Sequence, residues 1–233
     1  VAACIYRGAT KKLLKLEEPS PRTCGGVNSD SCNENQVLHI ECDSGVCGNR
    51  VLQGGGCVPL TVRHLGGREW AAAFSQDVGA GVILGEYVGE CLPLSVFEPR
   101  MRGVRALPVE QRKYYFCAVD KRHIIIDART FGNYTRFLQH SCEPNCALVP
   151  YTSKGLRHIV VKTLRSGRAG DLATVSYGWT DGEWNETCKC GAATCSGSIA
   201  RLPGTKVEID LTADSPPSPG QGGPGPKRRR GAR

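Results

Sequence analysis

The stretch GNYTRFLQHSCEPNC, residues 132–146, concentrates side chains that can do chemistry. It holds an arginine, a histidine, a serine and two cysteines in fifteen residues, between apolar segments that favour strands. Such a mixture fits a catalytic centre, a metal site or a polar surface loop, because all three use these residue types. The rest of the sequence is needed to choose among these alternatives.

Cysteine is the most informative residue type in the composition. The chain has 13 cysteines among 233 residues, an odd number, and they gather towards its two ends. The first residues, VAACIYRGATKK, lack the apolar stretch of a secretory signal. A disulfide-rich secreted protein is one alternative, but zinc bound by thiolates in a reducing compartment is favoured.

Two groups of cysteines indicate metal binding. Residues 188–197, CKCGAATCSG, supply three ligands, whereas structural zinc takes four. No cysteine follows Cys195, so the fourth ligand lies upstream, where Cys142 and Cys146 are candidates. The second group is five cysteines within 24–57, a segment with too few large apolar residues to bury a core without metal.

The body of the chain, 58–178, predicts a mainly β fold. Four apolar segments bounded by glycine or polar turns predict strands: 81–90, 109–128, 156–164 and 171–179. A glycine divides the first segment, a DKR turn divides the second, and a Ser-Gly turn joins the last two. A short helix is predicted within EPRMRGVRALPVEQRK, residues 98–113.

Composition and charge exclude some classes of protein. With 40% hydrophobic residues the chain can bury a core, and no run approaches the ~18 apolar residues of a membrane span. The net charge of +8 comes partly from KRRRGAR at 227–233, which follows a segment rich in proline and glycine. This pattern is typical of a disordered basic tail, with a nuclear-import or nucleic-acid-binding patch as the alternative.

The motifs GEYVGE, IDARTFGNYTRFLQHSCEPNC, VSYGW and CKCGAATCSG together resemble the SET-domain protein lysine methyltransferases in order and spacing. The resemblance covers about residues 24–200 and rests on a long, specific central motif. It implies a fold of several small sheets with a pseudo-knot, flanked by zinc-bound cysteine-rich segments. It also implies transfer of a methyl group from S-adenosylmethionine to a lysine amine.

Tyrosines suit this reaction. A lysine amine attacks only when neutral, although its ordinary pKa is about 10.4, and a narrow aromatic channel favours the neutral form by desolvation. By the resemblance, Tyr177 in VSYG and Tyr87 in GEYVGE are catalytic, and Tyr115 and Val175 line the substrate channel. Taken singly, each tyrosine would be interpreted as a core residue, but the order of the motifs favours the functional interpretation.

The cofactor pocket of the family is built from two segments, usually Gly-Trp-Gly and Arg-Phe-hydrophobic-Asn-His-Ser-Cys. The resemblance assigns these residues to cofactor binding: Trp70, Tyr114, Arg136, Phe137, Gln139 and His140. Glu69 and Ala71 replace the two glycines, and Gln139 replaces the asparagine. These three replacements favour the alternative of a SET-like chromatin module that has lost its activity.

The resemblance also implies about two structural zinc ions. The first is assigned to four cysteines at and after the His-Ser-Cys motif: Cys142, Cys188, Cys190 and Cys195. Cys146 is then expected to be a buried bystander. The second belongs to a reduced form of the cluster that precedes the SET domain in the Ash1, NSD and SETD2 subgroup (AWS, associated with SET), with these ligands: Cys24, Cys32, Cys42 and Cys47. Cys57 is a substitute ligand, and a segment without metal is the alternative.

The predicted substrate is lysine 36 of histone H3. Gly132-Asn133-Tyr134 and the SCEPNC run look most like enzymes acting on that lysine, while 49–53 also resembles the SUV39-like group that acts on lysine 9. Val175 stands where the family usually has phenylalanine or tyrosine, so we expect di- or trimethylation.

The sequence divides into five parts: an arm (1–23), an AWS-like zinc segment (24–57), a SET domain (58–179), a post-SET zinc segment (180–200) and a disordered basic tail (201–233). The expected partner is the histone H3 tail or a nucleosome in nuclear chromatin, with DNA contact through the basic tail. We expect a monomer that does not bind membranes. A zinc-stapled nucleic-acid-binding protein is a third hypothesis, and it predicts salt-sensitive DNA affinity.

Overall fold

The computed structural model describes the middle of the chain and several shorter parts. The described residues are 5–6, 35, 38–42, 47, 49–67, 69–108, 111–119, 124–178 and 186–200. Their elements are β1 (Ile5–Tyr6), α3 (Val51–Gly54), β2 (Leu60–Gly66), β3 (Glu69–Phe74), β4 (Ile83–Glu86), β5 (Glu90–Pro93), α4 (Leu94–Arg105), β6 (Phe116–Ala118), β7 (Ile124–Asp127), the 3₁₀ helix η2 (Tyr134–Phe137), β8 (Gln139–His140), β9 (Cys146–Ser153), β10 (Leu156–Thr163) and β11 (Thr174–Val175). The expected tail at 201–233, the DKR turn and all of the arm except β1 lie outside the described residues.

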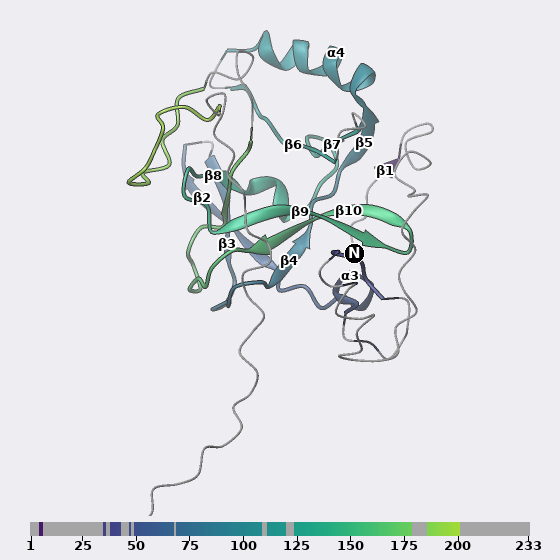
Figure 1. The fold of residues 1–233 in the computed structure, drawn as a ribbon. Helices are drawn as coiled ribbons and strands as arrows, with labels where there is room; N and C mark the ends of the chain where they lie inside the picture. Colours follow the sequence, from purple (N-terminus) through teal and green to yellow (C-terminus); the bar gives the residue numbers. More distant parts are fainter. Residues whose placement is uncertain are drawn as a thin grey trace, which may run out of the picture.

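The described strands form four small sheets (Figure 1). Their strand orders are β1-β5-β7-β6, β4-β10-β9, β11-β8 and β2-β3. Most neighbours are antiparallel, while β1 with β5 and β8 with β11 pair in parallel. The predicted mainly β fold of several small sheets is therefore confirmed. No described helix combines the length and apolar character that crossing a bilayer needs.

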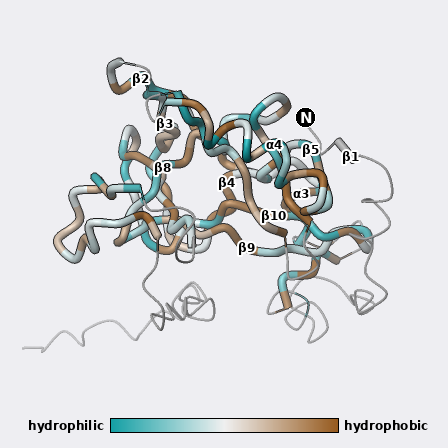
Figure 2. The backbone as a smooth tube through the Cα atoms, turned by 90° about the horizontal axis from the view of Figure 1, so that it is seen from above, coloured by the Kyte–Doolittle hydropathy of each residue, from teal (hydrophilic) through white to brown (hydrophobic). Residues whose placement is uncertain are grey.

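The sheet β4-β10-β9 carries the middle of the core, where Figure 2 shows the hydrophobic stretches of the tube. Three consecutive residues of β10, Ile159, Val160 and Val161, are all buried. Since alternate residues of a strand face opposite sides, Val160 packs in one cluster with Tyr151 and Val161 in another with Phe74. A β-branched run buried on both faces is typical of a central strand.

Several elements are not predicted by the sequence, and two of them, β9 and β2, show why. β9 contains Pro150, and a proline argues against a strand because it lacks the N–H that a sheet needs. In the structure β9 is the outer strand of its sheet, where Pro150 is exposed and tolerated. β2 is exposed along its whole length after Leu60, and its apolar and polar residues alternate only over 60–63, which is too short a pattern to indicate a seven-residue strand.

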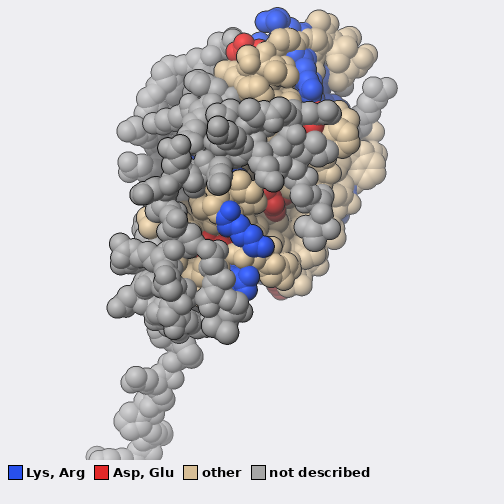
Figure 3. All heavy atoms as spheres, turned by 90° about the vertical axis from the view of Figure 1, so that its right-hand side faces the viewer, with Lys and Arg blue, Asp and Glu red and all other residues tan. Residues whose placement is uncertain are grey.

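The helix α4 covers the sheet formed by β5, β7 and β6. Phe97 and Met101, four residues apart, are buried against Leu92 and Ile125. The helix predicted within 98–113 is confirmed, although it begins earlier and ends at Arg105. Lys and Arg side chains gather at the top of the molecule, where α4 lies (Figure 3).

Buried charges join α4 to this sheet. Glu90 and Asp127 are opposite each other on β5 and β7 and are both buried. Arg100 of α4 lies 2.7 Å from Glu90 and 3.5 Å from Asp127, and Arg129 lies 2.7 Å from Asp127. Burial alone would raise the pKa of Asp127, but the hydrogen bonds from Arg129 hold it below its ordinary value. The Asp127 carboxylate is therefore charged, and both carboxylates are paired with arginine side chains.

The segments 156–164 and 171–179 are strands, but they do not pair with each other. β10 pairs with β4 and β9, whereas β11 pairs with β8. Asn145 holds this arrangement, since its amide donates to the Leu172 carbonyl at 2.8 Å and accepts from the Thr174 N–H at 2.8 Å. The segment 136–142 and the strand before Tyr177, which the resemblance expects to form the pseudo-knot, thus lie side by side.

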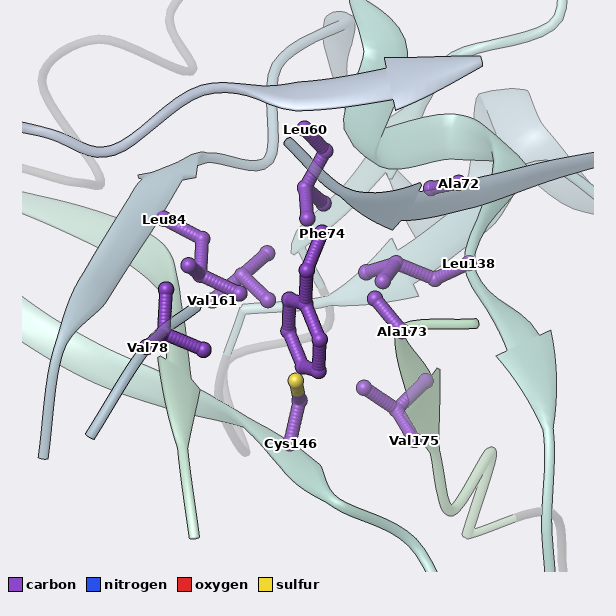
Figure 4. Packing of buried hydrophobic residues seen from close by; sticks show 10 residues of the cluster. All are labelled: Leu60, Ala72, Phe74, Val78, Leu84, Leu138, Cys146, Val161, Ala173 and Val175. Carbon is purple, nitrogen blue, oxygen red and sulfur yellow. The ribbon is translucent and has the colours of Figure 1, made fainter. Parts of the chain in front are cut away.

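A cluster around Phe74 connects β3 with β11 (Figure 4). The Phe74 ring points towards Cys146, with Leu84 and Val161 on one side and Leu138 and Val175 on the other. Cys146 is fully buried here and is not in the four-cysteine group described below. Its expected place as a buried bystander is confirmed.

Gly167→Ala is expected to destabilise this cluster, because a Cβ at Gly167 would overlap the Phe74 ring. Overpacking of a core costs about 1–3 kcal/mol, so urea unfolding should give a lower free energy of unfolding. Gly79→Ala is the matched control, because nothing lies within 4 Å of a Cβ there. Equal stability of the two variants would contradict the packing described here.

Candidate active site

A cavity of about 320 Å³ lies where β6, η2 and β11 meet. It is lined by Tyr87, Tyr114, Phe116, Cys117, Ala118, Val119, Thr135, Arg136, Leu138, Leu148, Pro150, Ile159, Val175, Ser176, Tyr177 and Gly178. Half of the predicted catalytic, channel and cofactor residues are in this lining, namely Tyr87, Tyr114, Arg136, Val175 and Tyr177. The other half are not, namely Trp70, Tyr115, Phe137, Gln139 and His140.

Tyr177 follows β11 and is fixed by three contacts. Its hydroxyl donates a hydrogen bond to the Leu138 carbonyl at 2.8 Å, and its backbone N–H donates to Nδ1 of His140 at 3.2 Å. The rings of His140 and Tyr177 meet edge to face at 5.3 Å. Burial raises the pKa of Tyr177 above its ordinary value, so the phenol stays protonated at neutral pH.

Tyr87 is held by hydrogen bonds to the peptide group that joins it to Glu86. Its N–H donates to the Ile159 carbonyl at 2.8 Å. The carbonyl of the preceding residue, Glu86, accepts a hydrogen bond from the Asn133 amide at 2.9 Å. The Thr135 hydroxyl in turn donates to the Asn133 side chain at 2.6 Å. Burial is the main cause that raises the pKa of Tyr87 well above its ordinary value, so this phenol is also protonated.

Arg136 stacks on two aromatic rings beside the cavity. Its guanidinium carbon lies 4.6 Å from the centre of the Tyr115 ring and 5.2 Å from that of Phe137. These two rings meet edge to face at 5.9 Å. Nε of Arg136 is buried and has no hydrogen-bond partner among the described residues. Such a donor is available to an anionic group of a bound molecule.

The two predicted cofactor segments are joined by a direct hydrogen bond. The amide of Gln139 donates to the Trp70 carbonyl at 2.8 Å, so the longer side chain reaches across to β3. Trp70 is 46% exposed, and its ring packs on His64 at 4.8 Å. Of the two residues that replace glycine, Ala71 is fully buried and Glu69 is exposed.

Four cysteines come together beside His140: Cys142, Cys188, Cys190 and Cys195. Their sulfur atoms all lie within 4.8 Å of one another, and that of Cys142 is 3.8 Å from Cys188 and 4.0 Å from Cys195. Tetrahedral zinc with bonds of about 2.3 Å separates its sulfurs by about 3.8 Å. The group therefore fits a zinc ion.

Backbone N–H groups donate hydrogen bonds to two of these sulfurs. The N–H of Cys142 donates to the sulfur of Cys190 at 3.5 Å, and the N–H of Gly197 donates to that of Cys195 at 3.5 Å. The bond from Cys142 is the largest cause that lowers the pKa of Cys190 to about 6. A thiolate is the form that binds zinc, so Cys190 is in the binding form at neutral pH, whereas burial raises the pKa of Cys188 to about 12 and its proton has to leave when a metal binds.

The C-terminal cysteine segment is tied to the body at two further points. Glu143 accepts hydrogen bonds from the hydroxyl and N–H of Thr194 at 2.6 and 3.0 Å. On the other side, Glu186 accepts from the Tyr114 hydroxyl at 3.2 Å and lies 3.7 Å from Arg112. Since Tyr114 lines the cavity, the segment carrying the zinc ligands borders the cavity as well.

Near the N-terminus, Cys42 and Cys47 form a small buried cluster. The amides of Asn35 and Asn49 each donate to the sulfur of Cys42 at 3.4 Å, and the N–H of Asn49 donates to that of Cys47 at 3.4 Å. Hydrogen bonds from Asn35 and Asn49 therefore fix the positions of both sulfurs.

The second zinc site stays a prediction, because Cys24 and Cys32 lie outside the described residues. Cys57 packs at the edge of the central core and joins no group of possible metal ligands in the described part of the chain. The segment itself is docked by the buried Glu41, whose carboxylate accepts from the Ser153 hydroxyl at 2.8 Å.

Comparison with known families agrees with this geometry. The family model described as "SET domain" matches residues 70–178. The chain carries a SET domain. The matched residues begin in β3 and end just after Tyr177, so they contain every residue that lines the cavity. The four-cysteine group takes one ligand from the SET domain and three from the segment that follows it.

Relatives of this SET domain are large proteins. The chain is 29% identical over 206 residues to histone-lysine N-methyltransferase ASHH2 of Arabidopsis thaliana, which covers 85% of this chain and 11% of that protein. It is 29% identical over 185 residues to the Homo sapiens "Histone-lysine N-methyltransferase, H3 lysine-36 specific", at 76% of this chain and 7% of that protein. It is 32% identical over 174 residues to histone-lysine N-methyltransferase Su(var)3-9 of Drosophila pseudoobscura pseudoobscura, at 66% and 27%. The chain thus spans 11% or less of the first two relatives.

Cys117, Thr135 and Glu186 are examples of residues at or beside the cavity that the sequence reasoning missed. Cys117 lies in the short strand FCA, whose three residues all line the cavity, so the alternation of the strand gave no signal for it. The Asn133-x-Thr135 spacing is typical of side chains that hydrogen-bond the local backbone. Glu186 gives no signal, because it lies in a polar segment without periodicity.

Cys195→Ser is expected to lower the zinc content by one ion per chain and to destabilise the C-terminal segment, because zinc binding contributes to folding. Elemental analysis of the purified chain measures the zinc content. Cys146→Ala removes a buried sulfur outside the group and should leave the zinc content unchanged. Unchanged zinc in Cys195→Ser would rule out this ligand set.

Asn133→Ala is expected to reduce the free energy of unfolding by about 1–2 kcal/mol, because it removes the cap of η2 and the hydrogen bond to Glu86. Asn133→Asp keeps the acceptor for the Thr135 N–H but loses the donor to the Glu86 carbonyl. Its free energy of unfolding should therefore lie between that of Asn133→Ala and that of the original chain. Urea unfolding gives all three values. If both variants have the same free energy of unfolding as the original chain, the hydrogen bonds of Asn133 beside Tyr87 do not contribute to stability.

Proposed function

We propose that this chain is an S-adenosylmethionine-dependent protein lysine N-methyltransferase that acts on histone H3 at lysine 36. The observation that carries the proposal is a cavity within a SET domain whose wall holds two protonated tyrosines, Tyr87 and Tyr177. The relatives named above support it, since their printed names are those of histone-lysine N-methyltransferases.

The cavity suits a lysine amine as the methyl acceptor. An ammonium group has to lose a proton before its nitrogen can attack, and its ordinary pKa is about 10.4. Apolar walls at Leu148, Ile159 and Val175 disfavour the charged form, and the phenol of Tyr177 is fixed by its bond to Leu138. In each turnover a proton leaves the amine for solvent, a carbon–nitrogen bond forms, and the carbon–sulfur bond of the cosubstrate breaks.

S-adenosylmethionine would be held by the residues around Trp70 and Gln139, which a hydrogen bond brings together. Its sulfonium supplies the electrophilic methyl group. Arg136 offers a buried donor without a partner to the carboxylate end of the cosubstrate. His140 is neutral because burial lowers its pKa, so it adds no positive charge beside a sulfonium.

The test of the proposal has to distinguish it from one alternative substrate and one alternative function. Lysine 9 of histone H3 is the alternative substrate, and the relative Su(var)3-9 together with residues 49–53 supports it. A SET-like chromatin module without activity is the alternative function. It is supported by Glu69 and Ala71 in place of glycines, and by the use of the Gln139 amide within the protein.

The wider setting is proposed from the same resemblance. We infer nuclear chromatin as the location, the histone H3 tail or nucleosome as the partner, and DNA contact through the tail at 227–233. We also infer two zinc-bearing segments flanking the SET domain, at 24–57 and 180–200, and a monomeric chain.

Calorimetric titration of S-adenosylmethionine into the zinc-loaded chain is expected to give a micromolar Kd, followed by methylation of nucleosomal histone H3 at lysine 36. Tyr177→Phe should keep cosubstrate binding but lose methylation by at least about 100-fold, since Tyr177 lines the cavity and its hydroxyl is the group proposed to orient the acceptor amine. No binding at millimolar cosubstrate would favour the inactive module, and product at lysine 9 alone would favour that substrate.

A further inference from the structure

A second cavity, of about 440 Å³, runs along the helix α4, and we call it the α4 groove. One of its walls follows the i, i+3, i+4, i+7 pattern of a single helix face: Leu94, Phe97, Glu98, Met101, Arg102 and Arg105. The other wall comes from the sheet, through Phe116 of β6 and Ile125 of β7. The α4 groove therefore has an apolar floor along the length of the helix.

The α4 groove and the cavity of the SET domain share one residue, Phe116, which is in the lining of both. Its ring packs on that of Phe97 in α4, with the ring centres 5.0 Å apart. Phe116 is only partly buried in this cluster, as is Leu94 at the start of the helix. A side chain that fills the groove would therefore contact a residue that also forms the wall of the cavity.

The rim of the α4 groove is mainly positive. Arg102 and Arg105 lie in the last turn of α4, whereas Glu98 is the acidic residue in the described lining. Figure 3 shows the Lys and Arg side chains that gather over this end of the molecule. The groove is therefore complementary to a segment that combines apolar side chains with acidic ones.

The described part of the chain ends close to the α4 groove. The N–H of Ile199 donates to the Glu186 carbonyl at 2.9 Å, and the Glu186 carboxylate lies 3.7 Å from Arg112. The side chain of Arg112 in turn donates to the carbonyl of Leu107, just beyond α4, at 2.9 Å. These contacts link the last described residues to the C-terminal end of α4, where the rim arginines lie.

The residues that follow include a segment of complementary composition. Residues 207–214, VEIDLTAD, hold all three acidic residues of 201–233 and three of its four large apolar residues. The apolar residues at 207, 209 and 211 alternate with polar ones, so in an extended chain they lie on one face. The seven steps from Ala200 to Val207 can span up to about 25 Å, and a 12-residue helix is about 18 Å long, so the segment can reach the groove.

We propose that residues 207–214 bind in the α4 groove of the same chain, with their apolar side chains on its floor and their acidic side chains beside the rim arginines. The basic end of the chain, 227–233, does not suit this rim because like charges repel. Binding covers Phe116 and so stabilises β6, which forms one wall of the cavity. The inference does not depend on the proposed activity, because contacts and amide exchange test it without methylation.

Photochemical cross-linking in the full chain tests where the segment binds. Ile209, on the apolar face, is replaced by the photoreactive amino acid benzoylphenylalanine, and Gln221, outside the segment, is replaced likewise as a control. Mass spectrometry should find cross-links from position 209 to α4 or β6 within one chain, and none from position 221. Adding Arg102→Glu should lower the yield about 2- to 5-fold, the effect of losing an exposed ion pair. Arg168→Glu is the matched control, since Arg168 is exposed and outside the groove lining.

Two further variants test the apolar contact with natural side chains. Ile209→Asp and Thr212→Asp each add one carboxylate, the first on the apolar face of the segment and the second on its polar face. In Ile209→Asp the amides of β6 should exchange with deuterium about 10-fold faster, because a large apolar side chain leaves the groove. In Thr212→Asp they should exchange as in the original chain.

Three outcomes would overturn the inference. The first is a set of cross-links from position 209 that reaches neither α4 nor β6. The second is a cross-link that joins two chains, which would show that the groove binds another copy of the protein. The third is unchanged exchange of the β6 amides in Ile209→Asp. An unchanged cross-linking yield in folded Arg102→Glu would contradict the ion pairs at the rim.

Discussion

Two short strands, β8 and β11, pair in parallel, and the functional groups of the SET domain are placed by this pairing. β8 leads into Cys142 of the zinc group, and β11 leads into Tyr177 of the cavity. His140 contacts both, since Nδ1 accepts from the Tyr177 N–H and Nε2 lies 3.7 Å from the sulfur of Cys142. A pair of two-residue strands is weak by itself. The hydrogen bonds of Asn145 and the zinc ligands therefore supply the stability that the pairing lacks.

Most of the titratable side chains around the cavity are uncharged at neutral pH. Burial keeps the phenols of Tyr87 and Tyr177 and the thiol of Cys117 protonated. It also keeps His140, at the edge of the site, neutral. Arg136 is the cation in the lining, and its guanidinium group stacks on the rings of Tyr115 and Phe137. A site of this kind penalises an ammonium group and tolerates a neutral amine.

The sequence was informative where function depends on residues close together in the chain. The fold class, the four C-terminal cysteines and the cavity positions of Tyr87 and Tyr177 followed from motifs. It was less informative about which of two neighbouring residues lines the cavity, because neighbouring residues in extended chain face opposite sides. Tyr114 lines the cavity whereas Tyr115 stacks on Arg136 beside it. The strand around Pro150 was hidden for another reason, since its edge position depends on sheet order that local patterns do not encode.

The position of the zinc ligands also has a consequence for biosynthesis. Cys142 is 46 residues before Cys188 and 53 before Cys195, so the group closes a loop around β9, β10 and β11. Closing such a loop costs conformational entropy, which metal binding offsets. The chain emerges from the ribosome with its N-terminus first. The cavity residues therefore leave the exit tunnel before Cys195, the last zinc ligand. The site is therefore completed only when Cys195 has emerged and a zinc ion is at hand, which links the maturation of this protein to the metal supply of the cell.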